Sequence, residues 1–278
     1  MRITSLSVIV AIALLSAPVS AQGVLIAPQA VVADANGAAT LTIINPDTKR
    51  VEIAFSTMYG YPVTDERGQL RLQTFATVAD TMPSAADWVT VYPKRFTLDA
   101  GQRQTVRLVV SPPTNTGAGE YWARLVVSSK GALPESKVAV ADSSAPVTMQ
   151  LDLEVRSVLP LLYRRGSVAT NLTITNVDTD QTADSLGVRP VMLRRGNAAW
   201  VGTVSVGLRD GANTEVRHFE MPMAVYYSLA PRLALPLGGL PSGRYTLEVN
   251  AVARRQDLPR HQVLAAAPQH FRTEIRVP

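Results

Sequence analysis

Side chains that could carry out catalytic or metal chemistry are few in this sequence, and they are not grouped. The three histidines are His218, His261 and His270, and none lies at metal-ligand spacing from another or beside a nucleophile motif. The chain has no cysteine, which excludes thiol catalysis and most structural zinc sites. It also lacks a phosphate-binding Gly-Lys-Ser/Thr loop and a Gly-x-Ser-x-Gly elbow. The sequence therefore predicts no enzyme, no catalytic residue, no metal site, no cofactor and no small-molecule substrate.

The charged clusters do not indicate a ligand either. The acidic run from Asp178 to Asp184 is spaced like the start of a calcium loop, but it lacks the required glycine and closing glutamate, so we interpret it as turn residues. Arginine pairs at 164–165, 194–195 and 254–255 are short and far apart. Because they form no basic stripe, we interpret them as solvated surface and predict no nucleic-acid partner.

The most regular pattern in the chain is a period-two alternation that begins at Val147. Alternate residues lie on opposite faces of a strand, so one face is apolar and the other polar. The apolar face resumes after Ser157 and reaches Tyr163. Such a strand is either a half-buried member of its own sheet or one whose apolar face binds another polypeptide. The apolar residues of its first part are Val147, Met149, Leu151, Leu153 and Val155.

The first 21 residues have the layout of a cleavable export signal. A positive start at Arg2 precedes an apolar run from Leu6 to Leu15, and small residues end at Ala21. This run is too short for a stable membrane span, although a retained anchor is the alternative. The sequence thus predicts a soluble, exported protein that begins near Gln22.

The remaining residues, 22–278, are long enough for two domains. Short alternating segments follow one another with frequent turns, and no helical apolar stripe occurs after the leader. This favours an all-β protein built of sandwiches. The predicted strand Trp88–Tyr92 and the predicted reversal at Asp65–Gly68 illustrate the pattern. We expect core side chains at Trp88, Leu98, Val106, Leu108 and Trp122 in the first half, and at Leu172, Ile174, Tyr245 and Leu247 in the second.

An internal echo supports two copies of one fold. Leu41–Thr48 recurs as Leu172–Thr179 with six of eight positions matching, and Gly119-Glu120-Tyr121 recurs as Gly243-Arg244-Tyr245. Similar pieces in the same order indicate duplication, with chance similarity as the alternative because the segments are short. We therefore predict a signal peptide at 1–21 and immunoglobulin-like domains at 22–165 and 166–278.

The run from Val91 to Leu108 resembles the first domain of the PapD-like family of periplasmic pilus-assembly chaperones. In that family a proline and a leucine precede an Ala-Gly or Pro-Gly turn, a glutamine and a Val-Arg strand, as Pro93, Leu98, Ala100-Gly101 and Gln104-Thr105-Val106-Arg107 do here. The Ile44-Asn45-Pro46 turn, the Tyr121–Val127 strand and the Leu161–Arg164 strand end fit the same domain. The resemblance covers residues 22–165. The second half resembles the family only in that it reads as an immunoglobulin-like module.

The resemblance implies donor-strand complementation, in which a chaperone lends a strand to a pilus subunit that lacks its last one. The lent strand here would be Val147–Tyr163, and the subunit would contact its alternate apolar residues. The implied partners are a pilin or fimbrial subunit and an outer-membrane usher. The alternative is a structural surface or adhesion protein, and a genomic neighbour encoding an usher or pilin would distinguish the two.

One departure from the family concerns the anchoring of the subunit's terminal carboxylate. Family members use an arginine near the first strand and a lysine on the long strand, and the aligned residues here are Gln29 and Pro160. Neither is a cation. If a carboxylate anchor exists, the remaining candidates on the long strand are Arg156 and Arg164.

Overall fold

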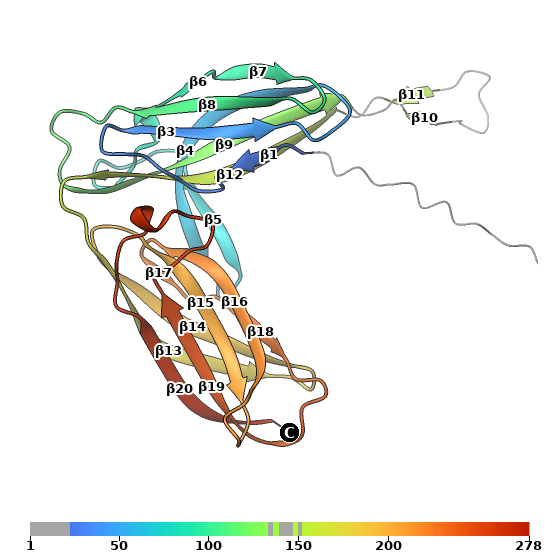
Figure 1. Cartoon of the computed structure of the whole chain (residues 1–278), viewed down its shortest axis with the longest axis vertical. Helices are drawn as coiled ribbons and strands as arrows, with labels where there is room; N and C mark the ends of the chain where they lie inside the picture. Colours follow the sequence, from blue (N-terminus) through green and yellow to red (C-terminus); the bar gives the residue numbers. More distant parts are fainter. Residues whose placement is uncertain (1–22, 133–135, 139–146, 150–151, 278) are drawn as a thin grey trace, which may run out of the picture.

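The computed structural model describes residues 23–132, 136–138, 147–149 and 152–277, and it contains two β-sandwiches set at an angle to each other (Figure 1). The predicted signal peptide, residues 1–21, lies outside the described residues. In the described part of the chain, no helix is both long and apolar enough to cross a membrane. The sheets change over between Arg165 and Thr170, and no strand is shared between the two sandwiches. The domain boundary predicted at Arg165–Gly166 stays a prediction.

The first sandwich packs a four-stranded sheet on a larger one. The four-stranded sheet has the order β1-β3-β8-β6, and the larger sheet has the order β2-β12-β9-β4-β5, with β7 also paired to β4. The strands of the first are β1 (Leu25–Ala27), β3 (Ala38–Ile44), β8 (Arg103–Val110) and β6 (Val89–Tyr92). Those of the second are β2 (Val31–Val32), β12 (Asp152–Arg165), β9 (Gly119–Ala132), β4 (Val51–Thr64), β5 (Leu70–Phe75) and β7 (Arg95–Leu98). The chain crosses from one sheet to the other between β6 and β7.

The core of the first sandwich lies between these two sheets. Because side chains alternate across each strand, every second residue of β8 faces inward, and Val106 and Leu108 are completely buried. Leu98 and Trp122 are also buried, while Trp88, in the short 3-10 helix η1 (Ala86–Trp88), packs partly buried against them. The core residues expected from the sequence are therefore confirmed here.

The second sandwich is built the same way from the remaining strands. One sheet has the order β13-β14-β17, with β18 also paired to β14, and the other has the order β16-β15-β19-β20. Leu172, Tyr245 and Leu247 are buried between them and Ile174 is partly buried, as expected. The strands are β13 (Thr170–Gln181), β14 (Ser185–Gly196), β15 (Trp200–Arg209), β16 (Glu215–Val225), β17 (Ser228–Leu229), β18 (Leu233–Pro236), β19 (Gly243–Val252) and β20 (Gln269–Val277). The prediction of an all-β protein with two immunoglobulin-like sandwiches is confirmed.

One half of the internal echo has a structural counterpart. Tyr121 opens β9 and Tyr245 opens β19, and each hydroxyl donates to the carbonyl oxygen four residues upstream, Gly117 at 3.0 Å and Pro241 at 2.8 Å. This is the tyrosine corner found in many immunoglobulin-like sandwiches. The repeated Gly-x-Tyr sequence therefore builds the same corner in both sandwiches.

The other half of the echo, Leu41–Thr48 and Leu172–Thr179, has different structures in the two sandwiches. Asn45 ends β3, is completely buried, and donates from its amide to the carbonyls of Lys49, Leu98 and Asp99. Its counterpart Asn176 lies inside β13 at a bulge, is exposed, and donates to Asp178 instead. The same short sequence thus ends a strand in one sandwich and continues it in the other, because only the first has carbonyls positioned to bind the amide.

Candidate functional site

β12 is paired unequally along its two edges. On one edge it pairs antiparallel with β9 at fourteen consecutive positions, from Asp152 with Ala132 to Arg165 with Gly119. On the other edge it pairs only with β2, in parallel, at Leu161 and Leu162. Within the described ranges, the edge from Asp152 to Pro160 therefore has no strand beside it. An unpaired edge exposes backbone donors and acceptors that can bind an added strand.

The two faces of β12 differ in burial. Glu154, Arg156 and Val158 point outward and are exposed, while Leu159, Leu161 and Tyr163 are buried in the first core. Val155 and Ser157 lie on the inward face and are half-buried. The inward face thus becomes less buried toward the start of the strand. This is the face on which the predicted subunit-contacting residues lie.

The predicted strand Val147–Tyr163 is only partly described. Val147–Met149 forms β11, which pairs with β10 (Ser136–Val138), and β12 begins at Asp152. Figure 1 shows the β10–β11 pair projecting beyond the end of the first sandwich. Leu151 lies outside the described residues, as do the side chains of Val147, Met149 and Leu153. Their role in binding a subunit stays a prediction, and Val155 is the one whose half-buried side chain is described.

Arg156, a predicted carboxylate anchor, lies on the outward face of β12. Its Nε donates to Glu154 Oε1 at 2.8 Å, and its side chain is 67% exposed. The Arg156 guanidinium, together with the Ser128 hydroxyl, holds the pKa of the Glu154 carboxyl below its usual value. Gln29, aligned with the family's arginine, is exposed in the bend between β1 and β2, and Pro160 is half-buried in β12.

Arg164, the other predicted anchor, is engaged in a contact between the two sandwiches. Its Nε donates to Glu120 Oε2 at 2.8 Å, and its Nη1 donates to the carbonyl of Gln262 at 2.7 Å. The Arg164 side chain is only 15% exposed and that of Glu120 is fully buried. This geometry favours a structural role for Arg164 over the binding of a terminal carboxylate.

Glu120 links the first sandwich to the second. Its Oε1 accepts from Trp122 Nε1 and from the backbone N–H of Ala199, each at 2.9 Å, while Oε2 accepts from Arg164. The Glu120 backbone N–H also donates to the Asn197 carbonyl at 3.1 Å. A fully buried carboxylate with three donors is stable only while all of them stay in place. Glu120 thereby fixes the start of β9 against the second sandwich.

Aromatic rings fill the space beside Glu120. Trp122 meets Tyr226 edge-on with ring centroids 4.7 Å apart, and it meets Tyr227 at 5.3 Å. Tyr61 from β4 lies 4.9 Å from Tyr227. Tyr226 is almost completely buried, and this burial raises the pKa of its hydroxyl. We call this contact region of Glu120, Trp122, Arg164, Tyr226 and Tyr227 the junction.

A hairpin from the first sandwich makes a second contact with the other one. The turn between β4 and β5 is closed by Asp65, as predicted, and the Gly68 carbonyl accepts from the backbone N–H of Arg232 at 2.9 Å. Gly68 has a φ of +76°, and a Cβ there would lie 2.7 Å from the Arg232 nitrogen. Only glycine fits this approach. Together with the junction, the hairpin connects the two sandwiches at two separate places.

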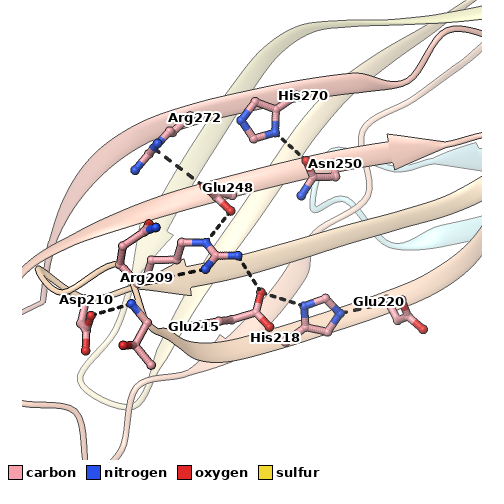
Figure 2. Close-up of polar contacts among 11 residues, drawn as sticks. Arg209, Asp210, Glu215, His218, Glu220, Glu248, Asn250, His270 and Arg272 are labelled. Carbon is pink, nitrogen blue, oxygen red and sulfur yellow. Dashed lines mark hydrogen bonds and ion pairs between the residues drawn. The ribbon is translucent and has the colours of Figure 1, made fainter.

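The outer face of the β16-β15-β19-β20 sheet carries a network of charged side chains (Figure 2). Glu248 accepts from Arg209 at 2.9 Å and lies 3.8 Å from Arg272, and His218 lies between Glu215 at 3.3 Å and Glu220 at 3.8 Å. Among the described residues, no three histidine or carboxylate side chains are grouped so that they could hold a metal ion. We interpret this network as solvated surface, in line with the sequence.

Of the junction residues, Trp122 was expected in the core and Arg164 was predicted as an anchor, but Glu120, Tyr226 and Tyr227 were not identified as site residues from the sequence. In the sequence Glu120 belongs only to the Gly-Glu-Tyr echo, and Tyr226 and Tyr227 belong to no motif. A glutamate placed beside a tyrosine-corner residue and followed by tryptophan is a weak signal of a buried carboxylate. Its partners Ala199 and Arg164 lie 79 and 44 residues away, so only the folded chain brings them together.

Comparisons with known proteins give matches in structure and none in sequence. No protein-family model matches the chain, and no curated protein matches it. A chain of the CsuC–CsuE chaperone–tip adhesion subunit complex of Acinetobacter baumannii superposes with a TM-score of 0.43 and 11% identity, over 90% of this chain and 98% of that one.

Two further solved structures are similar over most of their length. The Salmonella enterica SafA pilin–SafB chaperone complex matches with a TM-score of 0.41 and 16% identity, over 90% of this chain and 95% of that one. The E. coli chaperone DraB matches with a TM-score of 0.36 and 17% identity, over 82% and 91% respectively. Likenesses at these TM-scores carry no argument about what this chain does, which has to come from its own residues.

Proposed function

We propose that this protein is a periplasmic chaperone that binds and caps pilus or fimbrial subunits by donor-strand complementation through the strand Val147–Tyr163. The observation that carries the proposal is the unpaired edge of β12 from Asp152 to Pro160. The opposite edge is paired with β9 over its whole length, so the backbone of β12 is already ordered. A strand added to a preformed edge gains main-chain hydrogen bonds without the cost of ordering that edge.

The alternating side chains of the strand would give this pairing its specificity. The alternation of the sequence would place Met149, Leu151, Leu153 and Val155 on one face of an added strand. Each apolar side chain buried in a subunit groove would contribute about 1.5–3 kcal/mol. The half-buried Val155 marks the point where the strand's inward face leaves the chain's own core.

The compartment and the second partner belong to the same proposal. The apolar leader at 1–21 supports export to the periplasm, where pilus subunits fold before assembly. A capped subunit has to be handed on, and the implied recipient is an outer-membrane usher. We assign the protein no enzymatic activity, cofactor, nucleic-acid partner or small-molecule substrate.

The alternative, a structural surface or adhesion protein, fits the fold less well. A subunit that polymerises by strand exchange lacks its last strand and leaves its own core open. Here β12 covers the first core, and β20 pairs with β19 from Gln269 to Val277 to complete the second sandwich. Both sandwiches are therefore closed by strands of this chain.

The direct experiment is co-purification with a pilin subunit that lacks its last strand. We expect the Leu151→Asn, Leu153→Asn double variant to keep the wild-type melting temperature and to lose the subunit. If both leucines belong to this protein's own core, burying two amides would lower the melting temperature by many degrees, because unsatisfied buried amides cost roughly 1–3 kcal/mol each.

A matched control lies on the opposite face of the same strand. The Asp152→Asn, Glu154→Gln double variant changes polar residues to isosteric ones and should retain both the melting temperature and the subunit. Loss of the subunit in this control as well would show that binding does not depend on the apolar face. The donor-strand proposal would then be wrong.

A further inference from the structure

β5 is an edge strand that is open to solvent along one side and on both faces. Among the described residues it pairs only with β4, from Leu70 with Thr64 to Phe75 with Tyr59. The β4–β5 hairpin runs from the first sandwich toward the second, which its tip contacts at Gly68 (Figure 1). Every residue of β5 from 70 to 74 is exposed. The hairpin therefore presents a complete strand edge that no other described strand covers.

The side chains of β5 do not protect this edge as those of other long edge strands do. Proteins usually block a free edge with charged residues or proline, because its backbone groups can otherwise pair with another chain. β16 and β20, at the edges of one sheet of the second sandwich, carry His218 and Arg272 among their charged outward residues (Figure 2). One face of β5 instead carries Leu70, which is 43% exposed, Leu72, which is 39% exposed, and Thr74.

The hydrogen bonds of the hairpin turn show which backbone groups of β5 point to its free side. The Asp65 N–H donates to the Gln69 carbonyl at 3.1 Å, so these two residues form a hydrogen-bonded pair. Hydrogen-bonded and non-hydrogen-bonded pairs alternate along an antiparallel ladder. The next pair, Thr64 with Leu70, is therefore a non-hydrogen-bonded one. Leu70 and every second residue after it thus direct their N–H and C=O groups away from β4.

The other end of the hairpin has the same alternation. Gly60 lies opposite Thr74, and its carbonyl accepts from Arg124 Nε at 2.9 Å. Arg124 belongs to β9, which lies on the side of β4 away from β5. The Gly60 carbonyl is therefore not paired with β5, as the alternation requires. The free edge consists of the backbone groups of Leu70, Leu72 and Thr74, the same residues that form the apolar face.

We propose that this edge is a self-association surface, on which β5 of a second copy of the chain pairs antiparallel about a two-fold axis at Leu72. An axis perpendicular to the sheet keeps the apolar face on the same side in both copies. Leu72 would then lie opposite its own copy, and Leu70 opposite Thr74 of the second copy. Because all of these residues direct their backbone groups to the free edge, each pair would be hydrogen-bonded across the axis.

The charge on β5 favours a second copy as the partner and Leu72 as the centre. Arg71, on the opposite face, already has a carboxylate, Asp65 at 2.7 Å, so the edge needs no acidic partner strand. Opposite Arg71 would lie Gln73 of the second copy, whose amide oxygen can accept a hydrogen bond. An axis at Arg71 would place two guanidinium groups directly opposite each other, which is unfavourable. An axis at Gln73 would leave Leu70 outside the pairing and lose its hydrogen bonds.

This surface is separate from the edge of β12. β5 and β12 lie toward opposite sides of the same sheet, with β9 and β4 between them. Pairing through β5 would join the larger sheets of two copies, and the open edge of each β12 would remain free. A six-residue strand is a small interface, so we expect a transient dimer with a dissociation constant of about 0.1–1 mM.

The first test measures self-association of the full mature chain by sedimentation equilibrium at concentrations up to about 1 mM. We expect a monomer–dimer equilibrium in the wild type. Leu72→Lys places two ammonium groups opposite each other at the axis and should weaken the dimer about fivefold or more. The matched control is Leu25→Lys, because Leu25 is an exposed leucine on an edge strand of the other sheet. A monomeric wild type, or equal weakening by both variants, would overturn the proposal.

Cysteine cross-linking tests the position of the axis, since the chain has no cysteine of its own. In a glutathione redox buffer Leu72→Cys should form a disulfide-linked dimer, because directly opposed residues are close enough for a disulfide. Thr74→Cys alone should not, because its copy would be displaced by four residues along the strand, about 13 Å. A mixture of Thr74→Cys and Leu70→Cys should give the mixed dimer. Equal self-linking of Thr74→Cys and Leu72→Cys would refute this pairing.

Two further measurements separate this surface from subunit capture and from other partners. Leu72→Lys should co-purify with a pilin subunit at the wild-type level, because β12 is unchanged. Loss of the subunit in this variant would contradict the independence of the two edges. The second probe is a strand peptide of alternating valine and threonine. If it binds at β5 while the chain itself stays monomeric, the edge serves another polypeptide, and the self-association proposal is wrong.

Discussion

The two halves of β12 have opposite environments although they belong to one uninterrupted strand. The second half, Leu159–Arg165, is buried on its inward face, pairs with β9 along one edge and with β2 at Leu161 and Leu162 on the other, and contains the Arg164–Glu120 ion pair. The first half, Asp152–Val158, has exposed outward side chains at Glu154, Arg156 and Val158, and one of its edges is unpaired among the described residues. The difference shows how one strand can be both a rigid structural element and a surface for a partner. The buried half fixes the direction in which the open half extends.

The largest expected effect concerns the ion pair at the end of the buried half. Replacing Glu120 by alanine leaves Arg164 without its carboxylate and removes the acceptor of Trp122 Nε1 and of Ala199 N–H. Breaking a buried ion pair costs about 3–5 kcal/mol, so the free energy of unfolding should fall by that amount in denaturant titration.

Glu120→Gln is the matched variant, because it keeps an oxygen that can accept hydrogen bonds and loses only the charge. It should destabilise less than Glu120→Ala. Equal unfolding free energies for wild type and Glu120→Ala would mean that the junction contributes nothing to stability, and the contrast between the two halves of β12 would then lose its basis.

A smaller effect is expected within the strand itself. Leu161 is completely buried, so Leu161→Ala should lower the free energy of unfolding by about 2–5 kcal/mol. Val158 in the open half is 40% exposed. Val158→Ala should therefore change the free energy of unfolding by no more than about 0.5 kcal/mol. Thermal melting of both variants compares the halves directly, and similar losses at the two positions would contradict the comparison.

The smallest effect concerns how the free energy of unfolding changes at acidic pH. In the folded protein Arg156 and Ser128 hold the pKa of Glu154 below its usual value of 4.5, whereas in the unfolded chain that pKa returns to it. A depressed folded pKa stabilises the protein above pH 4.5, and the contribution is lost as the pH falls through the folded pKa. Because Glu154 is exposed and solvent screens its charge, the change in stability should be hard to measure.

The Glu154 pKa itself is measurable by NMR titration of its side-chain carboxyl. Arg156→Ala should raise it toward 4.5 without altering the melting temperature at neutral pH. Because the Arg156–Glu154 ion pair is exposed to solvent, we expect Arg156→Ala to change the pKa of Glu154 and not the stability of the fold. A large loss of stability in Arg156→Ala would show that the open half is tied into the core after all.

Patterns that depend on near neighbours in the chain could be read without a structure. Side chains alternate across a strand with period two, so the apolar residues of the Leu159–Tyr163 segment and of Thr105–Val110 predict their own burial, and both are confirmed. The turn at Asp65 and the corners at Tyr121 and Tyr245 are also local, since each closes on a group within four residues. The sequence by itself therefore determined the fold class, most of the strands and the core.

Contacts between distant residues were decided only by the tertiary structure. Arg164 resembled a free cation in the sequence, and the folded chain pairs it with Glu120 and with a carbonyl 98 residues away. The unpaired edge of β12 follows from how short β2 is, which no alternation pattern encodes. Charge, burial and edge pairing at the junction depend on which strands meet there. That meeting depends on the packing of two whole sandwiches, which short-range sequence patterns do not record.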